Sequence, residues 1–224
     1  MQTVLITGGL SFIGHHITEF FIAKQYHVII HYHSKKPVLK LNGSYELIQA
    51  DFSNSESLNN FINQVFKKDI HILINNASIF QKSPISTWDL ASLQNIFNIN
   101  LFAPMLLSQT FIKQNIFSKN NEGLIINIID IYADRLVKNI IPYSLSKNAL
   151  KTFTLNLAKI SGEYIRVNGI SPGFVKEVDN KLLQKNIIKR NVKIEEIIQT
   201  IEFLLNNTAI TGEVINVDCG LSLY

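Results

Sequence analysis

Short apolar runs alternate along the chain with longer segments in which apolar residues recur every three or four positions. The runs lie at residues 3–6, 27–31, 45–50, 70–74, 124–129, 165–170 and 214–217, and valine and isoleucine dominate them, as in strands buried on both faces of a parallel sheet. The longer segments at 55–66, 90–117, 143–160 and 194–205, and one that begins near residue 17, have the period of amphipathic helices. This alternation predicts one doubly wound α/β domain over residues 1–224, with seven mostly parallel strands and helices on both faces.

The helical segment at 90–117 contains a proline. Pro104 has no backbone N–H, and its ring clashes with the preceding turn of a regular helix. We therefore expect a kink or a local adjustment of the helix near this residue.

The composition excludes several classes of protein. Hydrophobic residues make up 46% of the chain and charged residues 17%, which is typical of a globular protein rather than a disordered one. No uninterrupted apolar run reaches the roughly 18–20 residues that span a bilayer, and Met1 leads almost directly into the first strand without a signal-peptide pattern. We therefore expect a cytoplasmic protein without a membrane segment. The net charge of +4 comes from scattered lysines and arginines without interleaved aromatic residues, so we do not expect nucleic-acid binding. The single cysteine, Cys219, excludes an intramolecular disulfide and a cysteine-rich zinc site.

A glycine-rich turn joins the first strand to the first helix. Gly8, Gly9 and Gly14 directly follow the apolar run at 3–6 and precede the helical segment. Glycines let backbone amides approach a diphosphate, and the amino end of the helix adds a favourable dipole. Because a second strand follows at the expected distance, this context predicts a dinucleotide-binding turn rather than an ordinary strand–helix connection.

The residues after the second strand indicate which dinucleotide binds. An NAD-preferring site usually has an acidic residue there, which holds the 2′-hydroxyl of the adenosine ribose. This chain has instead His33, Ser34, Lys35 and Lys36. A hydroxyl and two ammonium groups favour the additional phosphate of NADP, so we predict NADP(H) as the cofactor. We expect only one of His31 and His33 to face a ligand, and we expect no metal site because no third ligand stands nearby.

A tyrosine and a lysine four residues apart are the main candidates for catalysis. In a helix, the spacing of Tyr143 and Lys147 places both side chains on one face, about one turn apart. Asp130 ends the apolar run at 124–129, so a strand end, a loop and a helix can converge on one small volume. A free tyrosine has a pKa of roughly 10, and a neighbouring ammonium stabilises its phenolate. We therefore expect Tyr143 to transfer a proton with the help of Lys147.

Several motifs, in this order and spacing, resemble the short-chain dehydrogenase/reductase family over essentially the whole chain. They are Thr7-Gly8-x-x-x-x-x-Gly14, Asp51, Asn75-Asn76-Ala77, Asn100, Tyr143-x-x-x-Lys147, Ser171-Pro172-Gly173, and Thr211-Gly212 followed by Val217-Asp218. The resemblance implies a Rossmann fold and the transfer of hydride from a nicotinamide to the carbon of a C=O or C=N group, with the proton from Tyr143. It also implies a homotetramer that packs through the helices at 90–117 and 143–160.

The resemblance assigns roles to further residues. Asn100 is expected to hold a water in the proton relay behind Lys147, and Asp51 to accept a hydrogen bond from the adenine amino group. Asn75 or Asn76 is expected near the adenosine ribose. The implied catalytic residues are Asp130, Tyr143, Lys147 and Asn100. The implied cofactor-binding residues are Gly8, Phe12, Ile13, Gly14, His33, Ser34, Lys35, Asp51, Phe52, Asn76, Ala77, Ser78, Tyr143, Lys147, Pro172 and Gly173.

Several positions are similar to one subgroup, the pteridine reductases, which includes the bacterial dihydromonapterin and dihydrofolate reductases. Most members of the family have serine at the position of Asp130, whereas this subgroup has aspartate. His31-Tyr32-His33-Ser34 and Asn76-Ala77-Ser78-Ile79-Phe80 are also similar to this subgroup. Phe12 is a departure, because it replaces the second glycine of the usual family turn and the arginine, reaching a phosphate, that the subgroup usually has.

Asp130 is the residue on which the predicted substrate depends. An ionised carboxylate would repel the negative charge that develops on a ketone oxygen. It can instead accept hydrogen bonds from the N–H groups of a pterin, or share a proton with Tyr143. Phe80 is expected either to stack the flat pterin ring against the nicotinamide or to pack in the core, and Ser78 to contact a cofactor phosphate or the pterin. Ser78, Phe80, Asp130 and Tyr143 are thus the expected substrate-binding residues.

The sequence therefore predicts an NADPH-dependent reductase that converts dihydrobiopterin, dihydromonapterin or dihydrofolate to the tetrahydro form. Two alternatives stay open. One is a carbonyl or 3-oxoacyl reductase of the same family with an unusual Asp130. The other is a catalytically idle regulator that senses the nucleotide, which Phe12 in place of a glycine motivates and the intact Tyr143, Lys147 and Asn100 set opposes.

Overall fold

Seven parallel strands form one sheet in the order β3-β2-β1-β4-β5-β6-β7 in the computed structural model, which describes residues 1–34, 41–117, 123–135, 137–163 and 165–223. The strands are β1 (Thr3–Ile6), β2 (His27–Tyr32), β3 (Tyr45–Gln49), β4 (Ile72–Asn75), β5 (Gly123–Ile128), β6 (Ile165–Pro172) and β7 (Val214–Val217). Every apolar run expected to be a strand is one, and the predicted doubly wound sheet is confirmed. The strand order reverses between β1 and β4, which is where α/β sheets of this kind bind their ligands.

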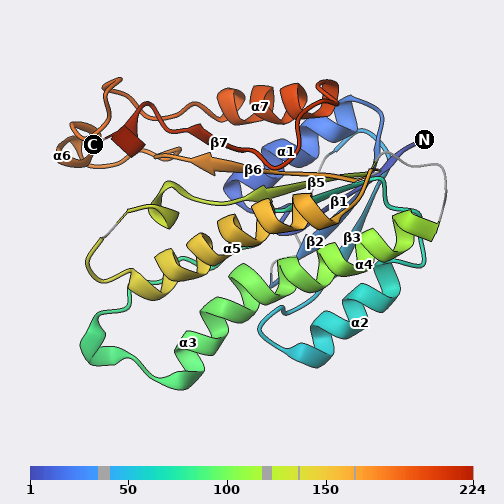
Figure 1. The fold of residues 1–224 in the computed structure, drawn as a ribbon, viewed down its shortest axis with the longest axis horizontal. Helices are drawn as coiled ribbons and strands as arrows, with labels where there is room; N and C mark the ends of the chain where they lie inside the picture. Colours follow the sequence, from blue (N-terminus) through green and yellow to red (C-terminus); the bar gives the residue numbers. More distant parts are fainter. Residues whose placement is uncertain (35–40, 118–122, 136, 164, 224) are drawn as a thin grey trace.

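Helices cover both faces of the sheet (Figure 1). They are α1 (Phe12–Ala23), α2 (Ser55–Val65), α3 (Leu90–Phe97), α4 (Ala103–Phe117), α5 (Ile141–Ile160), α6 (Asn180–Leu183) and α7 (Ile194–Asn206), with short 3-10 turns at Ile85–Thr87, Ile131–Ala133 and Leu221–Leu223. Helices α1 and α7 lie on one face, and α2, α4 and α5 lie on the other. All of these segments belong to one three-layered domain.

The two faces of the central strand explain why its sequence is apolar throughout. Val4 and Ile6 of β1 point toward α1 and pack with Phe21, whereas Leu5 points to the opposite face and packs in a cluster with Phe111 of α4. All five side chains are fully buried. A strand that buries both of its faces loses the alternation of apolar and polar residues that one solvent-exposed face would impose.

The helical segment at 90–117 contains the local adjustment expected near Pro104. Residues Asn98–Phe102 form a π-helical turn between α3 and α4, in which the N–H of Ala103 bonds to the carbonyl of Asn98. The wider turn lies directly before Pro104, whose missing N–H interrupts the regular helical pattern. The π-helical turn also buries Asn100 completely.

The same helical segment is rich in apolar residues, although polar residues interrupt them. Residues Leu90–Asn115 are long and apolar enough to cross a membrane, by length and composition only. Leu107 and Phe111, however, are fully buried in the core beneath the sheet. We therefore interpret the segment as a helix of the domain.

Candidate active site

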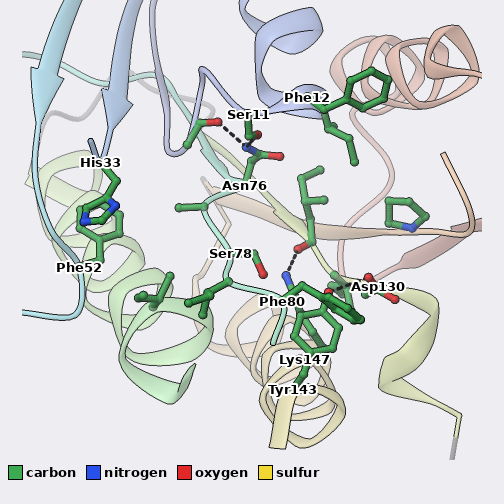
Figure 2. Close-up of a pocket in the computed structure, with 18 of the residues that line it drawn as sticks. Ser11, Phe12, His33, Phe52, Asn76, Ser78, Phe80, Asp130, Tyr143 and Lys147 are labelled. Atoms are coloured by element: carbon green, nitrogen blue, oxygen red, sulfur yellow. Dashed lines mark hydrogen bonds between the residues drawn. The ribbon is translucent and has the colours of Figure 1, made fainter. Parts of the chain in front are cut away.

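A cavity of about 920 Å³ lies at the carboxyl ends of the strands. Segments that follow β1, β2, β3, β4, β5 and β6 line it, together with α5. In Figure 2, His33 and Phe52 lie on one side of the cavity, Asp130, Tyr143 and Lys147 on the other, and Ser11 and Asn76 between them. The sheet thus brings together residues that are far apart in the sequence.

The turn after β1 requires glycine at two positions. Gly8 has a φ of +60°, and a Cβ on it would lie 2.9 Å from the Cα of Ala77. A Cβ on Gly14 would lie 2.2 Å from the carbonyl oxygen of Gly8. Gly8 lines the cavity, whereas Gly14 packs against the turn and keeps it tight. Both glycines therefore shape the cradle that the sequence predicted.

Side chains on either side of this turn fix its shape. Asn76 donates from Nδ2 to the carbonyl of Gly8 (2.9 Å) and to the hydroxyl of Ser11 (3.1 Å). Ser11 caps α1, because its Oγ accepts a hydrogen bond from the N–H of Gly14 (3.2 Å). The first turn of α1 has no acidic residue, so the helix presents its positive end to the cavity and suits an anion.

His31 was missed as a site residue and supports the turn from below. Its Nδ1 accepts a hydrogen bond from the N–H of Gly8 (3.0 Å), and its Nε2 donates to the carbonyl of Ala50 (3.0 Å). Its ring stacks on Phe52, with ring centres 3.9 Å apart. Burial lowers the pKa of His31 to about 4, so the imidazole stays neutral and keeps the tautomer with the proton on Nε2. The strand pattern gave no signal for this role, because residues two positions apart in a strand point to the same face and do not distinguish His31 from His33.

His33, two residues beyond His31, lies at the exposed end of the cavity. His33, Ser34 and Asp51 line this end, and Nε2 of His33 lies 3.8 Å from Oδ1 of Asp51. The hydroxyl of Ser53 donates to Asp51 (2.7 Å) and is the main cause that lowers the pKa of this carboxyl group. The expected phosphate ligand Lys35, and Lys36 beside it, lie outside the described residues.

The tyrosine and the aspartate meet directly at the other end of the cavity. The hydroxyl of Tyr143 donates a hydrogen bond of 2.7 Å to Oδ2 of Asp130, while Oδ1 of Asp130 accepts from the N–H of Tyr132 (2.8 Å). Burial raises the pKa of Asp130. Burial first, and the neighbouring carboxylate second, also raise the pKa of Tyr143 well above its usual value. The pair therefore holds a proton tightly between two oxygen atoms.

Lys147 is placed differently from the expectation. It is buried on the same face of α5 as Tyr143, but its ammonium donates to the carbonyl of Ile128 (2.9 Å). Burial lowers the pKa of Lys147 to about 8. The pKa of Tyr143 shifts in the direction opposite to the expected stabilisation of its phenolate by this ammonium, because burial first and the carboxylate of Asp130 second raise it.

Asn100 is a positioning residue rather than a lining residue in this structure. Its Oδ1 accepts hydrogen bonds from the N–H of Ile79 (2.8 Å) and the hydroxyl of Ser78 (3.1 Å). Its Nδ2 donates to the hydroxyl of Ser146 on α5 (3.0 Å). Asn100 thereby ties the loop after β4, which lines the cavity, to the helix that carries Tyr143.

Only one of the two neighbouring asparagines after β4 faces the cavity. Asn75 donates from Nδ2 to Oδ1 of Asn127 on β5 (2.8 Å) inside the sheet, and it does not line the described cavity. Asn76 does line it. Of the two residues expected near the ribose, only Asn76 is therefore placed to contact a ligand.

Aromatic side chains from three strand ends surround the Asp130–Tyr143 pair. Phe80, which follows β4, is 54% exposed, so it does not pack in the core. Its ring lies edge-on to Tyr143 (centres 4.9 Å apart) and near-parallel to Tyr132 (6.5 Å, 29° between planes). Tyr132 in turn contacts Phe174, which follows β6, with ring centres 6.4 Å apart. Tyr132 and Phe174 were missed, and their position directly after strand ends was the signal that could have found them.

The remaining predicted cofactor residues occupy the rim and middle of the cavity. These are Phe12, Ile13, Ala77, Ser78, Pro172 and Gly173, all of which line it. Phe52 also lines the cavity, with its ring stacked on His31. The structure thus gathers the glycine turn, the strand ends and the Tyr143 helix around a single space.

Comparison with known proteins agrees with this geometry. The sequence pattern of the family described as short chain dehydrogenase matches residues 2–187. The chain is 29% identical over 233 residues to the dihydromonapterin reductase of Enterobacter sp. (strain 638), covering 99% of this chain and 97% of the relative.

Solved structures share the fold over the full length. The chain resembles the FolM alternative dihydrofolate reductase 1 of Brucella canis in complex with NADP, with a TM-score of 0.89, 28% identity and coverage of 100% of this chain and 95% of that one. It also resembles 4-hydroxyisoleucine dehydrogenase in complex with NADH, with a TM-score of 0.92, 27% identity and full coverage of both chains. Together with the glycine turn and the Tyr143–Lys147 helix, the match over most of the chain shows that this protein belongs to the short-chain dehydrogenase family.

Proposed function

We propose that this protein is an NADPH-dependent reductase of a pterin, acting on dihydromonapterin, dihydrobiopterin or dihydrofolate. The observation that carries the proposal is the hydrogen bond between Tyr143 and Asp130 at the buried end of the cavity. An acidic acceptor beside the proton donor suits a substrate that presents N–H groups and disfavours one that develops a bare oxyanion. The names of the Enterobacter and Brucella relatives support the same substrate class.

The residues of the cavity fit a dinucleotide. The glycine turn leaves no room for a Cβ at Gly8 or Gly14, and the capped amino end of α1 faces the same space without an acidic residue. These groups would hold the diphosphate. Ser34 lies at the adenosine end, and no acidic residue follows β2 up to that position, which favours NADP over NAD.

Bound NADPH would supply the hydride, and the chain's own residues would handle the proton. Tyr143 already holds a proton on its hydroxyl oxygen, so it can donate this proton to the substrate nitrogen as that atom gains electron density. The raised pKa of Asp130 lets this carboxyl group share the proton with Tyr143 rather than remain a fixed anion. Lys147, buried one helical turn from Tyr143, supplies the positive charge of this end of the cavity.

The aromatic side chains favour a flat substrate. Phe80, Tyr132 and Phe174 come from three different strand ends, and the ring of Tyr132 contacts the rings of both other residues. Such a cluster offers stacking area to a planar heterocycle at low cost in side-chain entropy. A pterin has this shape, and its amino and ring N–H groups can donate to Asp130.

The proposal is tested by the oxidation of NADPH with a panel of substrates. Dihydromonapterin, dihydrobiopterin and dihydrofolate are compared with small ketones and 3-oxoacyl thioesters at equal concentration. We expect kcat/KM for at least one pterin to exceed that for every ketone. No turnover with any of the three pterins would refute the proposal.

A second candidate is a dehydrogenase or reductase of an alcohol–carbonyl pair. The similarity in fold to 4-hydroxyisoleucine dehydrogenase favours it. It predicts that kcat/KM for a ketone or oxoacyl thioester exceeds that for the pterins in the same panel. A regulator that only senses the nucleotide would bind NADPH and turn over no member of the panel.

We also propose that the enzyme is a cytoplasmic homotetramer. Large apolar side chains on the π-helical turn, α4 and α5 are exposed in the single chain: Phe102, Met105, Leu106, Leu145 and Leu155. A large exposed apolar patch is usually covered by a partner, and we propose that these side chains form one. Contacts through α4 and α5 would bury these side chains and leave the cavity accessible.

A further inference from the structure

The segment that follows β6 brings a lysine to the glycine turn. The ammonium nitrogen of Lys176 lies 5.1 Å from the centre of the Phe12 ring, and both residues line the cavity. Phe12 is the first residue of α1 and directly follows the capping residue Ser11. Figure 2 shows Phe12 near Ser11 and Asn76, away from His33. The contact therefore joins the segment after β6 to the amino end of α1.

The backbone before Lys176 is anchored. The N–H of Val192 donates to the carbonyl of Phe174 (2.8 Å), which closes the neck of the segment, and the N–H of Gly173 donates to the carbonyl of Val217 (2.9 Å). A Cβ on Gly173 would lie 2.8 Å from the Cα of Asp218, so the chain packs tightly at this point. Lys176 lies two residues beyond Phe174. The hydrogen bonds of Gly173 and Phe174 therefore limit where the backbone of Lys176 can lie and help to hold its side chain near the ring of Phe12.

The distribution of charge leaves Lys176 available to an anion. Of the lysines among the described cavity-lining residues, Lys147 is buried and bound to the carbonyl of Ile128, whereas Lys176 is exposed. Lys176 takes part in none of the ion pairs between described residues. Figure 2 shows Asp130 and His33 at two different ends of the cavity, away from Ser11, and Oδ1 of Asp51 lies 3.8 Å from Nε2 of His33.

We infer that Lys176, held over the ring of Phe12, contacts the diphosphate of the dinucleotide that the glycine turn receives. This inference rests on the proposed dinucleotide binding. The amide groups at the start of α1 and the ammonium of Lys176 would then flank the same anion. The cation–π contact restricts a flexible side chain before the ligand arrives, so less conformational entropy is lost on binding. Lys176 is the binding residue, and Phe12 is a positioning residue that acts through it.

The test compares the dissociation constants of NADPH and NADH at low ionic strength, measured by calorimetry. Both dinucleotides contain the diphosphate, and only NADPH has the 2′-phosphate. We expect Lys176→Gln to raise both constants by the same factor of about ten, which corresponds to about 1.4 kcal/mol and leaves their ratio unchanged. Lys176→Arg should keep both within about threefold of the wild type. Lys181→Gln, an exposed lysine of α6 in the same segment, is the matched control and should change neither.

The role of Phe12 is tested by combining variants. Phe12→Leu should raise both constants by an equal factor of about three, because the ring no longer holds the ammonium. Added to Lys176→Gln, it should have no further effect. An additive effect would overturn the positioning role.

Three results would overturn the inference about Lys176. They are unchanged constants in Lys176→Gln, an effect on NADPH alone (which places the lysine at the 2′-phosphate), and an equal effect of Lys181→Gln. If the wild type binds neither dinucleotide, the proposed function falls together with this inference. If the wild type binds both and Lys176→Gln changes nothing, only this inference falls.

Discussion

The hydroxyl of Tyr143 donates a hydrogen bond of 2.7 Å to Oδ2 of Asp130, although Asp130 lies thirteen positions earlier in the chain. The N-terminal turn of α5 carries the tyrosine, and the aspartate lies two residues after β5, directly before the 3-10 turn Ile131–Ala133. Burial raises the pKa of both groups, so the phenol and the carboxyl group stay protonated to a higher pH than usual. The phenol therefore holds a proton, which it donates in the hydrogen bond to Asp130.

Replacing Tyr143 with phenylalanine removes this donor. We expect kcat for the best pterin to fall by roughly 10²–10⁴-fold, the usual contribution of a general acid. The dissociation constant of NADPH should stay within about twofold of the wild type. Steady-state kinetics and a binding titration measure the two quantities, and a fall in kcat of less than tenfold would contradict the assigned role.

Two replacements of Asp130 test two different roles: Asp130→Ser tests its role in substrate choice, and Asp130→Asn tests its effect on stability. Asp130→Ser should lower kcat/KM for the pterins, because the acceptor for substrate N–H groups is lost. A gain in pterin turnover would argue against the carboxylate. Asp130→Asn keeps an acceptor oxygen for the N–H of Tyr132 but removes the titratable group.

The stability of Asp130→Asn relative to wild type should depend on pH. The pKa of Asp130 is higher in the folded protein than in the unfolded chain. Its contribution to stability is thus present below the unfolded pKa of about 4 and is lost as the pH rises through the folded value. The free energy of unfolding of Asp130→Asn, relative to wild type, should therefore increase with pH from about 4 upward. Urea denaturation across this range measures it, and a flat difference would show that the carboxyl is not buried.

The contribution of Lys147 to stability should change with pH in the opposite direction, and at alkaline pH. Burial lowers its pKa from its usual 10.5 to about 8, so the unfolded chain binds more protons than the folded protein between these values. The wild type should gain stability relative to Lys147→Met as the pH rises from about 8 to about 10.5. Denaturation at pH 7.5 and at pH 10 compares the two, with Lys181→Met as the control for an exposed lysine. An equal pH response of the two variants would rule out a buried ammonium.

Phe80 should act on substrate binding alone. We expect Phe80→Leu to raise KM for the pterin by about 3–10-fold through loss of aromatic stacking, with little change in NADPH affinity. Phe203→Leu on α7, a similarly exposed phenylalanine, is the matched control. If kcat rather than KM falls in Phe80→Leu, the ring positions the catalytic pair instead of the substrate.

The assembly is tested by its mass and by one surface change. Sedimentation equilibrium should give four times the chain mass of 25.4 kDa. Leu155→Lys on the exposed face of α5 should dissociate the tetramer, because it places a charge in an apolar interface. Ile85→Lys, exposed but outside these helices, should leave the mass unchanged. A wild-type monomer would contradict the proposed tetramer.

The local patterns of the chain are enough to predict most of the fold. The inner strands β1, β4, β5 and β6 are buried on both faces, so their apolar runs can be recognised without knowledge of their neighbours. The edge strands β3 and β7 are only partly buried. The glycine turn is equally local, because the left-handed Gly8 and the tight packing at Gly14 permit no larger residue. The local adjustment of the helix near Pro104 was predictable for the same reason, because a missing backbone N–H affects only the adjacent residues. The structure shows this adjustment as a π-helical turn.

Contacts between distant segments decided the rest of the site. Their position after strand ends makes Tyr132 and Phe174 candidates for the site, but the sequence does not show that they join Phe80, or that His31 supports Gly8. These residues meet only where separate strand ends converge. The ammonium of Lys176 above Phe12 has the same origin. The pKa of Tyr143 is the clearest case. The spacing in the sequence predicted that Lys147 would lower the pKa of the phenol. Burial and the hydrogen bond to Asp130, which exist only in the folded protein, raise this pKa instead.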